Sequence, residues 1–190
     1  MNRLTCLLWT ATLFFALACS TEQVVTDSDQ TSLVPSAPPE PSSMVALIPQ
    51  GAEVSPGLLT GGQPSRKQFA ELEALGLRTV INLRSPTERG TIQEPAWVEA
   101  LGFEYVSMPI EGGKDLTEAA ARQLDAVLRE ANGPTLVHCG SSNRVGALFA
   151  LRAFYVENKT VEEALEVGRA AGLTRLEAAT RRVLRRAAAG

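Results

Sequence analysis

The chain has 190 residues, with 18 Lys+Arg, 21 Asp+Glu, one His, three Cys and a formal net charge of −3. Its 45% hydrophobic content suits one globular domain with some chain left over. The small net charge argues against a nucleic-acid partner, one histidine excludes a multi-histidine metal site, and three cysteines cannot build a disulfide scaffold. We therefore expect any chemistry to depend on very few residues.

The first 19 residues are predicted to be a targeting segment. Arg3 precedes an uncharged run, residues 4–18, that is too short to span a membrane and fits the apolar core of a secretory signal. Small residues before Cys19 resemble a bacterial lipoprotein cleavage site, with Ala16 where Leu is more common. The sequence predicts a signal peptide over 1–19 and a lipid on Cys19, which anchors the protein to a membrane facing the periplasm or exterior. Cleavage after Ala18 without a lipid is the alternative.

Residues 20–43 are predicted to form a disordered tether. They are rich in Ser, Thr and Pro, with four acidic residues and no Lys or Arg. Such a composition cannot bury enough apolar surface to fold. Residues 44–190 carry 17 charges of each sign and are predicted to be the folded domain.

Strand and helix patterns alternate through this domain. Strands are expected at 58–60, 78–84, 103–109 and 135–138, and helices at 66–75, 94–101, 116–131, 145–157, 161–171 and 174–188. Ser65 is a predicted cap, and capping boxes are predicted at Asp115–Glu118 and Thr160–Glu163. The alternation predicts an α/β fold with a central, mostly parallel sheet of about four or five strands and helices on both faces.

The strand at 135–138 leads into His138-Cys139-Gly140-Ser141-Ser142-Asn143-Arg144 and then an apolar helix. A helix N-terminus, free amides and an Arg fork favour an anion, and the same field favours a thiolate. We therefore predict Cys139 as a nucleophile, with Arg144 and the amides of residues 140–143 binding an anion. A buried structural Cys beside a surface Arg is the alternative. His138 is not expected to act as its base, because neighbouring strand residues point to opposite faces.

Three stretches resemble the cysteine-dependent tyrosine and dual-specificity phosphatases, and most closely a bacterial branch of β-lactamase-hydrolase-like phosphatase domains. They are residues 59–65 (LTGGQPS), 79–84 (TVINLR) and 137–146 (VHCGSSNRVG). The resemblance implies a dual-specificity-phosphatase-like fold and a phosphocysteine on Cys139, without metal or cofactor. It implies that Arg144 and the amides of Gly140, Ser141, Ser142 and Asn143 hold the phosphoryl oxygens.

The chain departs from the common pattern of this superfamily in two places. Four residues, rather than five, separate Cys139 from Arg144, and Val145 replaces the usual Ser or Thr, for which Ser141 or Ser142 is a candidate substitute. Asp115 is the predicted general acid, with Glu111 as the alternative, although a capping role for Asp115 competes with catalysis.

We consider three functions for this site. Hydrolysis of a phosphorylated protein or small molecule is the first, sulfur transfer through a Cys139 persulfide, as in rhodaneses, is the second, and phosphate or phosphoprotein binding without catalysis is the third. The basic segment 173–188 is interpreted as a surface helix packed on the domain, with contact to an anionic membrane as the alternative.

Overall fold

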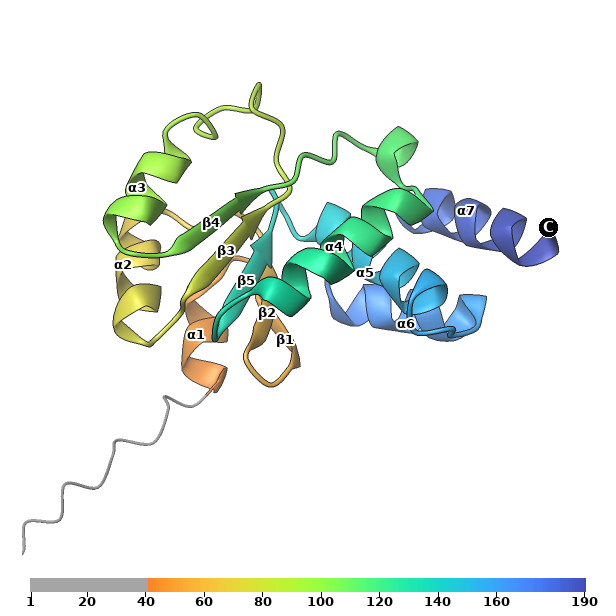
Figure 1. Ribbon diagram of the computed structural model, residues 1–190, viewed down its shortest axis with the longest axis horizontal. Helices are drawn as coiled ribbons and strands as arrows, with labels where there is room; N and C mark the ends of the chain where they lie inside the picture. Colours follow the sequence, from red (N-terminus) through yellow and green to blue (C-terminus); the bar gives the residue numbers. More distant parts are fainter. Residues whose placement is uncertain (1–40) are drawn as a thin grey trace, which may run out of the picture. The chain divides into compact units, whose positions relative to one another are not determined.

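The computed structural model describes residues 41–190 (Figure 1). The predicted signal peptide, Cys19 and the predicted tether up to residue 40 lie outside the described residues. Helix α1 (Pro41–Leu47) begins three residues before the predicted start of the domain. None of the helices in the described range is long and apolar enough to cross a membrane.

A five-stranded mixed sheet forms the centre of the domain. Its spatial order is β1-β2-β5-β3-β4, in which β1 and β2 are antiparallel and the other neighbours are parallel. The strands are β1 (Ala52–Ser55), β2 (Leu58–Gly61), β3 (Thr79–Asn82), β4 (Glu104–Ser107) and β5 (Thr135–His138). The predicted α/β architecture is confirmed, and the edge strand β1 was not predicted.

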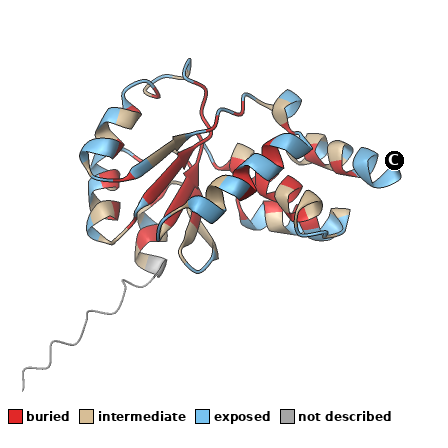
Figure 2. Ribbon diagram, viewed as in Figure 1, coloured by how far each residue is buried: buried red, intermediate tan, exposed pale blue. Residues whose placement is uncertain are grey.

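Helices cover both faces of this sheet (Figures 1 and 2). One face packs against α1, α2 (Arg66–Ala74) and α3 (Glu94–Ala100). The other packs against α4 (Glu118–Glu130), α5 (Asn143–Tyr155), α6 (Val161–Ala170) and α7 (Glu177–Ala189). Adjacent residues of the central strands supply different cores: Val80 and Leu136 face the first set of helices, and Ile81 and Val137 the second. Burial of both faces explains why these strands are apolar runs rather than alternating ones.

The predicted caps are confirmed at two helices and wrong at a third. Ser65 with Gln68 and Thr160 with Glu163 form complete capping boxes at α2 and α6. The cap of α4 is Thr117, whose hydroxyl accepts a hydrogen bond from the Ala120 amide. Asp115 instead ends a short 3₁₀ turn, η1 (Gly113–Asp115), and accepts from the Glu111 amide at 2.7 Å. Its carboxylate therefore closes the loop before α4 rather than starting the helix.

Helix α7 is packed on the domain rather than left unpartnered. Leu184 and Thr180 are fully buried, and Arg181 forms ion pairs with Glu162 of α6 and with Glu177. Hydrogen bonds from Arg169 and Arg181 hold the pKa of Glu177 at about 2, well below its usual range. These contacts agree with the interpretation of a packed surface helix.

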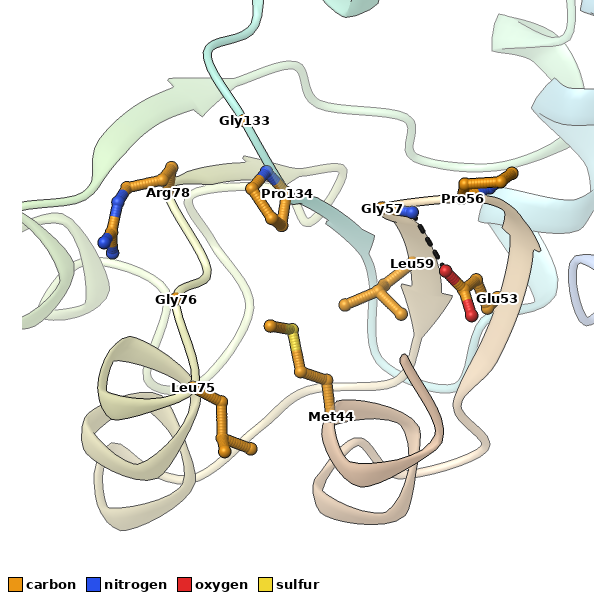
Figure 3. Close-up of a pocket in the computed structure, with 10 residues that line it drawn as sticks. All are labelled: Met44, Glu53, Pro56, Gly57, Leu59, Leu75, Gly76, Arg78, Gly133 and Pro134. Atoms are coloured by element: carbon orange, nitrogen blue, oxygen red, sulfur yellow. Dashed lines mark hydrogen bonds between the residues drawn. The ribbon is translucent and has the colours of Figure 1, made fainter. Parts of the chain in front are cut away.

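An apolar pocket of about 600 Å³ lies at the end of the sheet where the parallel strands begin (Figure 3). Met44, Leu59 and Pro134 contribute apolar surface, while the Glu53 carboxylate is held by the Gly57 amide at 2.9 Å. The loop after β5 is at the opposite end of the strands. This pocket is thus separate from the predicted site.

Candidate active site

The sequence-predicted loop leaves the sheet at its middle strand. Strand β5 lies between β2 and β3, so the loop 139–143 emerges at the carboxyl ends of the parallel strands, where such sheets bind ligands. The Cys139 amide donates to the Gly61 carbonyl of β2 at 3.2 Å. Cys139 itself is 1% exposed and is a free thiol. The sheet therefore fixes the backbone of Cys139 at the base of the loop.

Loop residues 142 and 143 turn directly into α5. Ser142 has a left-handed backbone (φ 59°) and is the N-cap residue, which makes the short connection possible. Its hydroxyl donates to the buried Ala171 carbonyl at 2.8 Å. The Asn143 side-chain oxygen accepts from the Thr174 and Leu176 amides at 2.9 and 3.2 Å. Both side chains are thus used to fasten the loop to the segment between α6 and α7. Of the two candidate hydroxyls, only that of Ser141 is left exposed.

Close packing behind the loop depends on glycine. A Cβ on Gly146 would lie 2.1 Å from the Leu173 nitrogen and 2.5 Å from the Gly168 carbonyl oxygen. Both are backbone atoms, so they cannot move aside as a flexible side chain can. The first turn of α5 is therefore held against α6 and the following turn.

The Arg144 side chain is fixed by a carboxylate that the sequence did not reveal. Its Nη1 and Nη2 atoms donate to the two carboxylate oxygens of Glu88 at 2.5 and 3.0 Å, and Nη1 also donates to the Ile110 carbonyl at 3.0 Å. A Cβ on Gly140 would lie 3.6 Å from Nη2, so this nitrogen lies over the loop. Nη1 donates to two acceptors and Nη2 to one, so Nε and the second proton of Nη2 remain as donors for a ligand.

The ion pair between Arg144 and Glu88 stabilises the charged form of each partner. Hydrogen bonding to Arg144, together with contacts from Ser85 and Arg84, lowers the pKa of Glu88 from 4.5 to about 2. The pKa of Arg144 is raised, first by its hydrogen bond to Glu88 and further by the neighbouring Cys139 thiol. Both groups are thus ionised across the physiological range, and the guanidinium lies close enough to the thiol to interact with it.

Glu88 is held in turn by Arg84, and Arg84 by Gln63. Both residues lie in stretches that resemble the phosphatase family, and neither had a predicted role. Arg84 Nε donates to Glu88 at 3.2 Å, and Arg84 Nη1 donates to the Gln63 side-chain oxygen at 2.5 Å. The Ser85 amide donates to the other Glu88 oxygen at 2.9 Å. Gln63 follows β2 and Arg84 follows β3, so two strand ends help to position the partner of Arg144. The only sequence signal for Glu88 was its place four residues after Arg84.

A pocket of about 440 Å³ opens at this point, lined by Ser85, Thr87, Glu88, Glu111 and Arg144. Glu111 follows Ile110, whose carbonyl accepts from Arg144. Its carboxylate accepts from Lys114 at 2.6 Å, and its side chain is 52% exposed. Asp115 instead lines a different hollow, on the α4 side. The structure therefore brings Glu111, rather than the preferred candidate Asp115, together with Arg144.

His138 lies on the other face of the sheet from Cys139, as predicted. Its ring packs edge-on against Phe69, with centroids 6.0 Å apart, and its Nε2 lies 2.9 Å from Glu94 Oε1.

Within residues 41–190, no group of three or more His, Cys, Asp or Glu side chains is arranged to hold a metal ion.

Comparison with known proteins shows what the chain is similar to. A family model described as a DSP-PTPase phosphatase fused to NAD+ kinase matches residues 46–186. The beta-lactamase hydrolase-like protein of Agrobacterium fabrum is 31% identical over 106 residues, which are 54% of this chain and 24% of that protein. The dual specificity protein phosphatase TpbA of Pseudomonas aeruginosa is 31% identical over 117 residues, 60% of this chain and 50% of TpbA.

A solved structure shows the same fold. A candidate phosphatase of Neisseria meningitidis superposes with a TM-score of 0.59 at 22% identity, covering 70% of this chain and 94% of that protein. The chain spans only about a quarter to a half of the length of the curated relatives named above.

Proposed function

The chain belongs to the DSP-PTPase phosphatase family, and we propose that it hydrolyses phosphomonoesters through a phosphocysteine formed on Cys139. The observation that supports this most directly is the pairing of Arg144 with Glu88 above the loop that begins at Cys139. This pair holds the guanidinium in one orientation, so that it can present an edge to a phosphoryl group.

We assign substrate binding to Arg144 and to the amides of the loop. The Nε–Nη2 edge of Arg144 is matched to two phosphoryl oxygens, and the amides of residues 140–143 at the start of α5 supply further donors. Phosphate binding then places phosphorus near the Cys139 sulfur. These donors also stabilise the charge that develops on the phosphoryl oxygens in the transition state.

Two steps complete the proposed reaction. The Cys139 thiolate attacks phosphorus while the bond to the leaving oxygen breaks, and Glu111 in its acid form gives that oxygen a proton. Water then attacks the phosphocysteine, with Glu111 accepting its proton, and phosphate leaves as the thiolate returns. Glu111 replaces Asp115 in this role because it lines the pocket that contains Arg144. The Ser141 hydroxyl is the one available to assist release of the sulfur, since Ser142 is bonded to Ala171.

The experiment that tests this proposal uses the full chain with an activated aryl phosphate, and in parallel with thiosulfate and cyanide. Cys139→Ser should abolish phosphate release, and Cys6→Ser, the same exchange in the predicted signal, should not change it. Phosphate release that persists in Cys139→Ser contradicts the proposed nucleophile. Sulfur transfer without phosphatase activity would instead support the persulfide mechanism, and Arg144-dependent phosphate binding without either activity would support a binding module.

We also propose that the protein is a bacterial lipoprotein exposed outside the cytoplasm, where it acts on a phosphorylated protein or small molecule. Support comes from the sequence of residues 1–19, with small residues before Cys19. Cys19→Ala should move the protein from the membrane fraction to the soluble fraction after cell lysis, and Cys6→Ala should not. An unchanged membrane fraction in Cys19→Ala argues against lipidation.

A further inference from the structure

The apolar pocket of about 600 Å³ at the start of the parallel strands has no role in the reaction proposed above (Figure 3). Its volume falls within the range of pockets that bind small molecules, about 300–1,000 Å³. Met44 and Leu59, which line the pocket, are only 5% and 1% exposed and belong to the core between the sheet and helices α1 to α3. The wall of the pocket is therefore part of the hydrophobic core.

Two glycine turns leave this pocket open. Gly57 (φ 74°) connects β1 to β2, and Gly76 (φ 94°) follows α2. Both backbones have the positive φ angle that favours glycine. A Cβ on Gly76 would meet no atom within 4 Å, and one on Gly57 would meet only the Pro134 Cα at 3.8 Å. Because neither turn contributes a side chain here, the chain does not fill the space beside its own core.

Arg78 and Glu53 line opposite sides of the pocket and carry opposite charges (Figure 3). The Arg78 stem packs on Gly133, where a Cβ would lie 3.1 Å from Arg78 Cγ, and Arg78 Nη1 donates to the Leu77 carbonyl at 3.0 Å. The Glu53 carboxylate accepts from the Gly57 amide at 2.9 Å. Neither side chain forms an ion pair with any residue in the range 41–190. Backbone groups thus orient both charges, and each is open to an opposite charge on a ligand.

We propose that this pocket binds a short peptide with free termini and apolar side chains. The peptide carboxylate pairs with the guanidinium of Arg78, the ammonium group pairs with Glu53, and the apolar side chains contact Met44 and Leu59. A ligand with only one charge would gain one favourable pair and meet one like charge, because both residues line the same cavity. The site is separate from the proposed phosphatase reaction, since Cys139 follows β5 and the pocket lies at the other end of that strand.

The three methionines of the chain allow a direct test. In the full chain labelled with ¹³C-methyl methionine, the NMR signal of Met44 reports on the pocket and is assigned with Met44→Leu. Met108, which is buried after the far end of β4, is the internal control. We expect the dipeptide Leu-Leu at pH 7 to shift the Met44 signal to saturation and to leave the Met108 signal unchanged. A Met44 signal that does not move with Leu-Leu up to about 10 mM overturns the proposal.

Charge variants test the orientation of the peptide in the same titration. Arg78→Gln and Glu53→Gln should each weaken Leu-Leu binding about two- to fivefold, as expected for an ion pair that water partly screens. Arg182→Gln and Glu166→Gln, which change exposed residues of α7 and α6, should leave the affinity unchanged.

Blocked peptides identify which charge each residue recognises. Leu-Leu amide lacks the carboxylate, so Arg78→Gln should not weaken its binding further, and Glu53→Gln should not weaken binding of N-acetyl-Leu-Leu, which lacks the ammonium group. Equal affinity for Leu-Leu and for a peptide blocked at both ends contradicts the proposal, and so does unchanged affinity in both charge variants. Free leucine that binds more tightly than Leu-Leu contradicts the assignment to a peptide. None of these measurements needs turnover, so the outcome of the phosphatase assay does not affect them.

Discussion

Replacing Glu88 with Gln removes the charge that holds Arg144 while keeping the side chain nearly the same size. In the folded protein the pKa of Glu88 is lowered from 4.5 to about 2, mainly by its hydrogen bond to Arg144. A carboxyl group with a lowered pKa stabilises the fold fully above its unfolded value, and this contribution disappears as pH falls through the folded value. The stabilisation by Glu88 is therefore complete above pH 4.5 and lost toward pH 2.

The size of the effect is limited by exposure. If the whole pKa change were converted, it would correspond to about 3.4 kcal/mol. The Glu88 side chain is 31% exposed, so water screens the pair and a contribution of about 1–2 kcal/mol is expected. Glu88→Gln should therefore be less stable than the unaltered protein by about 1–2 kcal/mol at pH 7.

Urea unfolding measures this difference without adding salt that would screen the ion pair. The two proteins should be compared between pH 7 and pH 2.5, and the difference between them should shrink steadily below pH 4.5. Glu166→Gln is a suitable control, because Glu166 is exposed and forms no ion pair with any residue in the described range. A difference that stays constant between pH 7 and pH 2.5, or that is absent at pH 7, would refute this account of Glu88.

Three further predictions concern the loop and its supports. Gly146→Ala should lower the free energy of unfolding by more than about 2 kcal/mol, measured by urea denaturation, since its Cβ would meet the Leu173 nitrogen at 2.1 Å. Ser142→Ala should cost about 1–2 kcal/mol in the same assay because it leaves the buried Ala171 carbonyl without its donor, whereas the exposed Ser141→Ala should cost less than about 0.5 kcal/mol. In kinetic assays, Glu111→Gln should reduce kcat/KM at least about tenfold for an alkyl phosphate but by less than about threefold for an activated aryl phosphate, and Asp115→Asn should treat the two substrates alike.

The sequence predicted those features that depend on residues close together in the chain. Apolar runs, glycine stops and capping residues predicted the strands of the sheet and its covering helices, and the series from His138 to Arg144 is itself a local pattern. Helix α1 was missed because its Pro and Ser residues continue the composition of the predicted tether. Strand β1 was missed because this short edge strand has only partly buried or exposed residues and no apolar run.

Contacts between side chains that are far apart in the sequence could not be predicted from local patterns. Glu88 and Arg144 are 56 positions apart, and Glu88 lies in an irregular segment with no periodic pattern. In the sequence, Glu94 is an ordinary acidic residue at the start of a predicted helix, although in the structure its carboxylate is buried against His138. The prediction of Asp115 as a cap failed because its carboxylate accepts from the Glu111 amide, while the Thr117 hydroxyl caps α4.

Residues from the three stretches that carry the family resemblance together orient one side chain, that of Arg144. Gln63 follows β2, Arg84 follows β3 and Arg144 follows β5, and these strands are neighbours whose carboxyl ends lie together. Gln63 holds Arg84, Arg84 holds Glu88, and Glu88 holds the end of the Arg144 guanidinium so that its other edge lies over the loop. An Arg left free would have to lose several rotamers when it binds a phosphoryl group. In the proposed function, the distant motifs contribute by removing that cost before the substrate arrives, although neither Gln63 nor Arg84 lines the pocket itself.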